Sequence, residues 1–186
     1  MRVFKSSKAI FFILLGWSLG EAYASNERVT VKQVELILQE PKAKLLAEVQ
    51  VQLSDSAQGA LHSGIPLYWD ISIVLQQAQW RGFWQREVFA QTWRYSLAYY
   101  TLLNNYRVQE EQEQSFRRFS SLHEALNYMG QLMYADLLMQ AYDSQRCVSW
   151  ALNVAFDREA LPTPLRPFSY FDQEWDLSAS KSLLCE

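Results

Sequence analysis

The chain has 186 residues, of which 49% are hydrophobic and 15% aromatic, and its formal net charge is −3 at pH 7. Mild acidity without a block of basic residues argues against nucleic acid and anionic lipid surfaces as partners. The length suits one domain with a single sizeable core. No stretch after the N-terminal region is long and apolar enough to predict a membrane-spanning helix.

The N-terminal 24 residues have the three parts of a secretory signal peptide. A basic start is followed by the apolar run AIFFILLGWSL at residues 9–19 and by Ala22-Tyr23-Ala24, a small-x-small cleavage pattern. This run is shorter than the roughly 20 residues that span a bilayer. We therefore predict that residues 1–24 are a signal peptide cleaved between Ala24 and Ser25, and that the protein is exported to the periplasm. The alternative is an uncleaved segment that anchors the protein to the inner membrane.

Two alternating segments, at residues 29–38 and 45–53, predict a first β-hairpin around the turn Glu40-Pro41-Lys42. The second segment predicts a strand with one wet face, because its apolar residues recur at every second position: Leu45, Ala47, Val49, Val51 and Leu53. Ser54 and Gly64 flank Asp55–His62 and predict a helix of two turns there.

The segment from Ile65 to Tyr106 predicts the two longest strands of the protein, joined at residues 79–83. Period-2 alternation is typical of half-buried strands, and it holds on both sides of that junction: Leu67, Trp69, Ile71, Ile73 and Leu75, then Phe89, Trp93, Tyr95, Leu97 and Tyr99. Asn104-Asn105 predicts a turn. A short further strand is expected at Tyr106–Gln109.

The second half of the chain contains fewer clear signals. Ser121-Leu122-His123-Glu124 is a capping box and predicts a helix that ends at Gly130. The segment 132–139 fits either a longer helix or a short strand, whereas 146–156 predicts a strand. After the proline-rich segment 161–165 we expect a helical turn at 168–171 and a last edge strand at Trp175–Leu177.

These elements predict a mostly β (α+β) fold for residues 25–186, which we expect to form a single antiparallel β-rich domain. The sheet is predicted to be an antiparallel β-sandwich or a strongly curved sheet, with one or two short helices over an edge or an open end. The alternative is a partly open β-barrel.

Residues with catalytic chemistry are scarce. The two histidines, His62 and His123, lie among polar residues of predicted helices, which is typical of solvated side chains. Asp70 and Glu87 lie on predicted strands, where acid–base chemistry requires that they be buried as a pair. The sequence has no nucleophile elbow, phosphate-binding loop or dinucleotide fingerprint, and no zinc-ligand spacing. We therefore predict no catalytic residues, no metal site, no cofactor and no enzymatic activity.

Two further features concern single side chains. Export permits a disulfide between Cys147 and Cys185, and the alternative is two unpaired, buried thiols. Arg166, which follows two prolines, is placed to pair with a carboxylate, and the alternative is a surface charge on a rigid loop.

Phe83 and Trp84 form a candidate contact patch beside Gly82, at the junction of the two longest strands. A turn needs no large aromatic side chains for packing, and exposed aromatic side chains often mark protein contacts. The alternative is that both residues belong to the core.

Four local patterns occur in order along the chain: ALHSGIPL at 60–67, YSLAY at 95–99, SLHEAL at 121–126, and LPTPLR at 161–166 with WDL beyond it at 175–177. In this order they resemble the bacterial domain-of-unknown-function 4390 family, over roughly residues 31–180. The resemblance implies an exported bacterial protein of one domain, and it implies no catalytic residues. The C-terminal sequence SKSLLCE departs from the Trp-rich strand with which the family ends.

We expect the protein to be a non-catalytic protein-interaction module of the cell envelope, whose partner is another envelope protein such as a sensor or an assembly component. The alternative is a carrier that holds an apolar ligand or lipid between the aromatic sheet and the helix at 121–130. An exposed patch over a filled core favours the module, and a closed apolar cavity favours the carrier.

Overall fold

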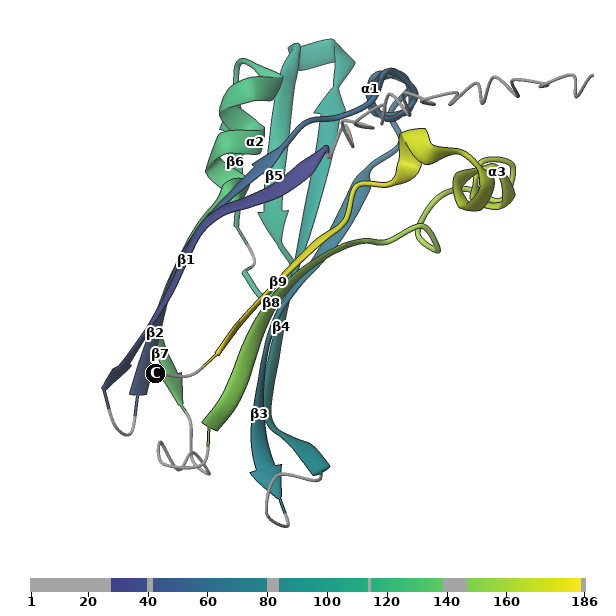
Figure 1. Cartoon of the computed structure of the whole chain (residues 1–186). Coiled ribbons are helices and arrows are strands. Elements are labelled where there is room, and N and C mark those ends of the chain that lie inside the picture. The colour runs from purple at the N-terminus through teal and green to yellow at the C-terminus, as the bar shows by residue number, and fades with distance from the viewer. Residues whose placement is uncertain (1–27, 40–41, 80–83, 114, 139–146, 185–186) are drawn as a thin grey trace, which may run out of the picture.

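The computed structural model describes residues 28–39, 42–79, 84–113, 115–138 and 147–184. These residues form two antiparallel sheets that are not closed into a barrel (Figure 1). The smaller sheet has the order β1-β2-β7, with β1 at Val29–Gln39, β2 at Lys42–Val51 and β7 at Gln131–Leu138. The predicted mostly β fold is confirmed.

The larger sheet has six strands in the order β6-β5-β4-β3-β8-β9. Its bounds are Phe116–Phe119 for β6, Asn105–Glu110 for β5, Trp84–Tyr100 for β4, Leu67–Gln79 for β3, Cys147–Phe156 for β8 and Ala179–Leu184 for β9. Strands β3 and β4 pair from Gln79 opposite Trp84 to Leu67 opposite Leu97. The two long strands predicted around residues 79–83 are therefore present.

The core lies between the two sheets, because each sheet buries one face against the other. Side chains alternate between faces along a strand, so the apolar parity predicted for β3 is the buried one. All five of its predicted residues are buried: Leu67, Trp69, Ile71, Ile73 and Leu75. Strand β2 of the smaller sheet contributes its own buried residues to the same core: Leu45, Ala47, Val49 and Val51.

Helix α1 (Asp55–His62) occupies the predicted range and is capped at both ends. The Ser54 side chain accepts a hydrogen bond from the backbone N–H of Ala57 at 3.1 Å. A carboxylate oxygen of Glu174 accepts the N–H of Ser56 at 3.1 Å, which satisfies a second free donor of the first turn. Gly64, with φ of +83°, then turns the chain toward β3, a conformation that glycine adopts without strain.

Helix α2 (Leu122–Gly130) connects the two sheets along one side of the molecule, since it contacts β2 of the smaller sheet and both β5 and β6 of the larger one (Figure 1). As predicted, Ser121 caps its N-terminus, because the Ser121 hydroxyl accepts the N–H of Glu124 at 3.2 Å. On the other side of the molecule β1 contacts β9, and the Lys181 ammonium donates to the carbonyl oxygen of Val31 at 3.4 Å. Nowhere in the described ranges is a helix both long and apolar enough to cross a membrane.

In two parts of the chain the structure differs from the predicted elements, and in a third it decides between helix and strand. Residues 132–138 of the ambiguous segment form strand, in β7, and β6 is a strand that the sequence does not predict. The predicted edge strand at Trp175–Leu177 is wrong. The Asp172 carboxylate accepts the N–H of Glu174 at 2.9 Å and starts a 3-10 turn, η4 (Gln173–Trp175), and the last strand is β9 instead.

Candidate functional site

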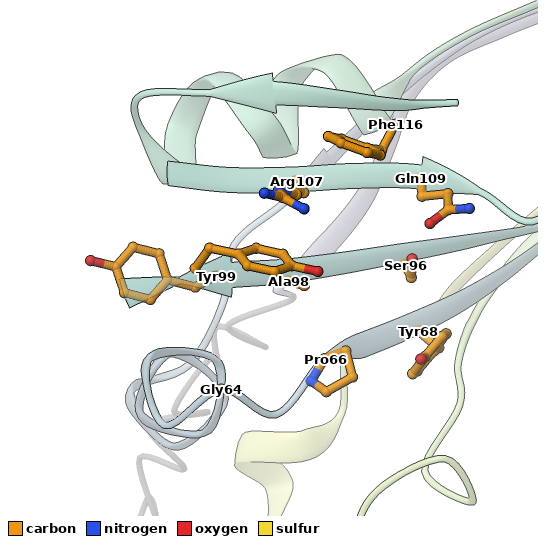
Figure 2. A pocket seen from close by; sticks show the side chains of 10 residues that line it. Gly64, Pro66, Tyr68, Ser96, Ala98, Tyr99, Arg107, Gln109 and Phe116 are labelled. Carbon is orange, nitrogen blue, oxygen red and sulfur yellow. The ribbon is translucent and has the colours of Figure 1, made fainter. Parts of the chain in front are cut away.

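A groove of about 330 Å³ lies on the outer face of the six-stranded sheet, which is the face turned away from the core (Figure 2). Strands β3, β4, β5 and β6 run side by side beneath it, and each contributes side chains. We call it the outer groove and define it by six residues: Tyr68, Ser96, Tyr100, Arg107, Gln109 and Phe116. Its volume falls in the range of small-ligand and side-chain sites.

The hairpin between β4 and β5 sets which side chains meet in the groove. Asn104 has left-handed φ and ψ of 46° and 48°, and Asn tolerates this region better than most residues. The register that follows places Tyr100 opposite Asn105, and Ala98 opposite Arg107. Because Ala98 is small, the Arg107 side chain has room to extend along the sheet.

Arg107 is the one charged residue that lines the outer groove. Its guanidinium carbon lies 3.6 Å from the centre of the Tyr100 ring and 4.6 Å from the centre of the Phe116 ring. Such cation–π stacking favours a fixed orientation of the guanidinium. Its Nε is buried without a hydrogen-bond partner, and no carboxylate of the described residues pairs with Arg107.

Arg118 extends the positive charge beyond the groove. It is the cross-strand partner of Arg107 in the β5–β6 register, and its guanidinium carbon lies 5.1 Å from the centre of the Phe116 ring. Two arginines therefore flank one phenylalanine. Like charges directly opposite each other in an antiparallel pair are destabilising, so this arrangement costs the free protein some stability.

The end of the groove near the β4–β5 turn is apolar and exposed. The 3-10 turn η2 (Thr101–Leu103) follows Tyr100 directly and leaves Leu102 fully exposed, at 100%, and Leu103 at 57%. Tyr100 and Phe116 are themselves partly exposed. Clustered exposed apolar side chains with a polar border are typical of contact surfaces.

Another arginine on the same sheet face, Arg94, is fully paired. Arg94 forms ion pairs with Asp70 at 3.3 Å, with Glu111 at 3.8 Å and with Asp157. Burial lowers the pKa of Arg94, but the hydrogen bond to Asp157 and the charges of the three carboxylates together raise the pKa above its ordinary value. This cluster holds β3, β4 and the end of β8 together.

The two strand carboxylates considered for acid–base chemistry do not meet. Asp70 is half-buried and pairs with Arg94. Glu87 is exposed and lies opposite Gln76. No acid–base pair is therefore formed by them.

The histidines are exposed, as expected, and each has a local partner. The His62 Nε2 lies 2.8 Å from the Tyr106 hydroxyl, and its ring packs edge-on against Tyr99 at 4.9 Å between centres. The His123 Nε2 lies 2.9 Å from the side-chain nitrogen of Asn127. Among the described residues, no three His, Cys, Asp or Glu side chains are grouped as a metal site requires.

Arg166 and its neighbours form a second aromatic surface at helix α3 (Arg166–Phe171). Arg166 pairs with the Glu159 carboxylate at 3.6 Å, which confirms the predicted carboxylate partner. The same helix exposes Phe168 and Tyr170 and leaves Phe171 90% exposed.

Of the remaining predicted site residues, the structure describes Trp84 and Cys147, and both lie apart from the outer groove. Trp84 is 71% exposed and begins β4, whereas Tyr100 of the groove ends the same strand. Cys147 is the first residue of β8. Phe83, Cys185, Ala24 and Ser25 lie outside the described residues, so the predicted patch partner, disulfide and cleavage site stay predictions.

Helix α2 packs tightly where the carrier hypothesis places a ligand. A Cβ atom added at Gly130 would lie 1.9 Å from the carbonyl oxygen of Val49 in β2, and Ala125, Leu126 and Met129 of the helix are buried. The outer groove lies on the opposite face of the larger sheet. The carrier hypothesis therefore gains no support from this packing.

Comparison with known proteins identifies the family. A family model described as "Domain of unknown function (DUF4390)" matches residues 26–183. No curated protein and no solved structure matches the chain. The match covers most of the sequence and confirms the resemblance that the four ordered patterns indicate. The chain belongs to the DUF4390 family, a domain of unknown function.

Proposed function

We propose that the protein is a non-catalytic interaction module of the cell envelope, which recognises another envelope protein, such as a sensor or an assembly component, through the outer groove. One observation supports this most directly: the Arg107 guanidinium lies within cation–π distance of both Tyr100 and Phe116, and exposed leucines follow Tyr100 in the chain. Tyrosine and arginine are the residue types, with tryptophan, that carry most binding energy at protein interfaces.

The position of the groove also suits a binding role. Its floor consists of paired strands in the middle and at one edge of the larger sheet, and such a floor needs little ordering when a partner binds. Preorganised surfaces lose less entropy on association and therefore bind more tightly for a given contact area.

The envelope location rests on the predicted signal peptide. N-terminal sequencing of the protein from cell fractions is expected to begin at Ser25, in the periplasmic fraction. Material that keeps Met1 and sediments with membranes would show instead that residues 1–24 anchor the protein.

The contact surface is tested with two matched serine substitutions. Leu102→Ser removes an exposed apolar side chain in the turn that follows Tyr100 of the groove, and Phe171→Ser removes one at α3, which is the control. Both side chains are exposed, so both variants are expected to keep the wild-type melting temperature. Affinity capture from an envelope extract, quantified by mass spectrometry, should show specific partners reduced by about tenfold with Leu102→Ser and unchanged with Phe171→Ser.

The reverse pattern would overturn the role of the groove. Partners that are lost with Phe171→Ser and retained with Leu102→Ser would place the contact surface on α3. Capture that is identical for both variants and the wild-type protein would remove both surfaces.

A further inference from the structure

We infer that Arg107 and Arg118 form a carboxylate-binding site, which takes an acidic residue of the partner polypeptide. This inference rests on the proposed function, because it names the chemistry that the partner presents to the outer groove. Three features of the larger sheet support it: two facing arginines that have no carboxylate partner among the described residues, a guanidinium held in one orientation, and a groove without acidic residues.

The first feature is the contrast, on one sheet face, between Arg94 and the pair formed by Arg107 and Arg118. Arg94 has three carboxylate partners, whereas Arg107 and Arg118 have none among the described residues. They face each other directly across β5 and β6. A carboxylate bound between the two guanidinium groups is attracted to both of them and offsets their mutual repulsion. Because this repulsion is already present in the free protein, binding the carboxylate relieves it.

The second feature is the orientation of the Arg107 guanidinium. The rings of Tyr100 and Phe116 lie within cation–π distance of it, so the terminal N–H groups in its plane are the donors left for a ligand. These N–H groups match the two oxygens of a carboxylate, which arginine binds bidentately. Because the stack holds the side chain in place, little rotamer entropy is lost when the ligand binds.

The third feature is the composition of the groove. No acidic residue lines it, and Ser96 and Gln109 add neutral hydrogen-bonding groups on neighbouring strands. The backbone N–H groups of the central strands are used in sheet pairing, so the floor lacks the free N–H groups with which helix N-termini bind phosphate. The site therefore offers an anion two guanidinium groups, one in the lining and one at the border, and no free backbone N–H groups.

The apolar rim favours a polypeptide as the source of the carboxylate. Leu102 and Leu103 lie exposed in the turn that follows Tyr100. A segment with an acidic residue beside an apolar one would place its carboxylate at Arg107 and its apolar side chain against these leucines.

The experiment measures the binding of short peptides by fluorescence anisotropy. The first probe is the peptide Gly-Leu-Glu-Leu-Gly with an amidated C-terminus and an N-terminal fluorophore that carries no charge, and its matched control has Gln in place of Glu. A third peptide carries Gln and a free C-terminal carboxylate. The Glu peptide is expected to bind at least about tenfold more tightly than the amidated Gln peptide and to weaken as salt is added.

Three substitutions assign the binding to the site. Arg107→Gln is expected to weaken the Glu peptide by about tenfold or more, and Arg118→Gln by several-fold. Arg86→Gln is the control, since Arg86 is an exposed arginine of β4 far from the groove, and it should leave binding unchanged. Arg118 is exposed, so Arg118→Gln tests the site even if Arg107→Gln disturbs the stack.

The outcomes separate the sources of the carboxylate. Tight binding of the third peptide would keep the site and assign it to a chain terminus. Equal binding of the Glu and amidated Gln peptides, or wild-type affinity in both Arg107→Gln and Arg118→Gln, would overturn the inference. Displacement of the Glu peptide by inorganic phosphate at lower concentration than by acetate would overturn it as well.

Failure of the carboxylate site is distinguishable from failure of the proposed function. If Leu102→Ser abolishes partner capture and the arginine variants do not, the groove remains the contact surface and the carboxylate site falls.

Discussion

The indole N–H of Trp69 donates a hydrogen bond to the backbone carbonyl oxygen of Leu177 at 3.2 Å, across 108 positions of the sequence. Both residues are completely buried. The Trp69 ring also packs against Phe156, with 5.3 Å between ring centres. This bond connects the middle of the larger sheet to the segment that joins η4 and β9.

Replacing Trp69 by phenylalanine removes the donor from this buried carbonyl group. We expect Trp69→Phe to lower the free energy of unfolding by about 1–3 kcal/mol through the unsatisfied acceptor, in addition to the cost of lost volume. Urea denaturation measures the change, with Trp84→Phe as an exposed control. Equal denaturation midpoints for Trp69→Phe and the wild-type protein would show that the bond contributes nothing.

Gly130 and Gly59 make opposite predictions for the same substitution. At Gly130 a Cβ would lie 1.9 Å from the Val49 carbonyl oxygen, whereas at Gly59 it would meet nothing within 4 Å. Gly130→Ala should therefore destabilise the protein by about 1–3 kcal/mol or more. Gly59→Ala, within α1, should stabilise it by about 0.5–1 kcal/mol. Thermal unfolding of both variants tests the packing of α2 on β2. A melting temperature of Gly130→Ala equal to or above that of the wild-type protein would contradict this packing.

We expect Glu110 to make the free energy of unfolding depend on pH. Burial first, and then the charge of Glu113, raise the pKa of Glu110 above its ordinary value of 4.5, while the Tyr95 hydroxyl donates to its carboxylate at 3.1 Å. The folded protein thus binds this proton more strongly than the unfolded chain, so the contribution to stability is present at low pH and falls as pH rises through the raised pKa.

The Glu110→Gln variant isolates this effect. It is expected to lose that part of the pH dependence and, at neutral pH, to be at least as stable as the wild-type protein. The measurement is the free energy of unfolding from acid to neutral pH for both proteins. Parallel curves would show that Glu110 does not titrate differently on folding.

Trp84 separates a core role from a contact role. Because its side chain is 71% exposed, Trp84→Ala should change the free energy of unfolding by no more than about 0.5 kcal/mol. A loss of about 3–5 kcal/mol would place it in the core instead. Partner capture by the same variant tests the predicted patch, because a loss of about 2 kcal/mol in binding would make Phe83 and Trp84 a second contact surface.

Counting thiols decides between the two alternatives for Cys147 and Cys185, a disulfide or two unpaired thiols. The β8–β9 register pairs Ser149 with Leu184, which brings the strand that begins at Cys147 beside the strand that precedes Cys185. If Cys147 and Cys185 pair, thiol titration of unfolded, unreduced protein should find no free thiol. Reduction should then lower the stability by about 3–4 kcal/mol on the chain-entropy model. Two titratable thiols would remove the bridge.

The elements that the sequence predicts well are those with local signals. Ser54 and Gly64 flank α1, and both perform the roles that their residue types indicate. Strand β6 lacked such a signal, because its FRRF sequence has two adjacent arginines and becomes a strand by pairing with β5. Trp175 misled the prediction for the opposite reason. The apolar–polar–apolar order Trp175-Asp176-Leu177 resembles a strand pattern. In the structure Trp175 instead lies in a 3-10 turn, where its ring packs against Phe156.

The candidate site depends on register, which is a relation between strands. Arg107 and Arg118 are ordinary arginines in the sequence, and nothing local indicates that they face each other. Asn104 gave a local indication of the β4–β5 side of the groove, since a tight turn there places Ala98 opposite Arg107. The pairing of β5 with β6 and the partners of Arg94 come from contacts between segments that sequence periodicity does not relate.

The position of β3 between β4 and β8 sets the order in which the larger sheet assembles. Leu75 pairs with Phe89 across a short hairpin and with Trp150 across a much longer stretch of chain. Closing the short loop costs less entropy, so we expect the β3–β4 hairpin to form early and the β3–β8 pairing late. Until residues 147–156 have been synthesised, one long edge of β3 therefore has no partner strand, and the nascent chain is most prone to aggregation through that edge.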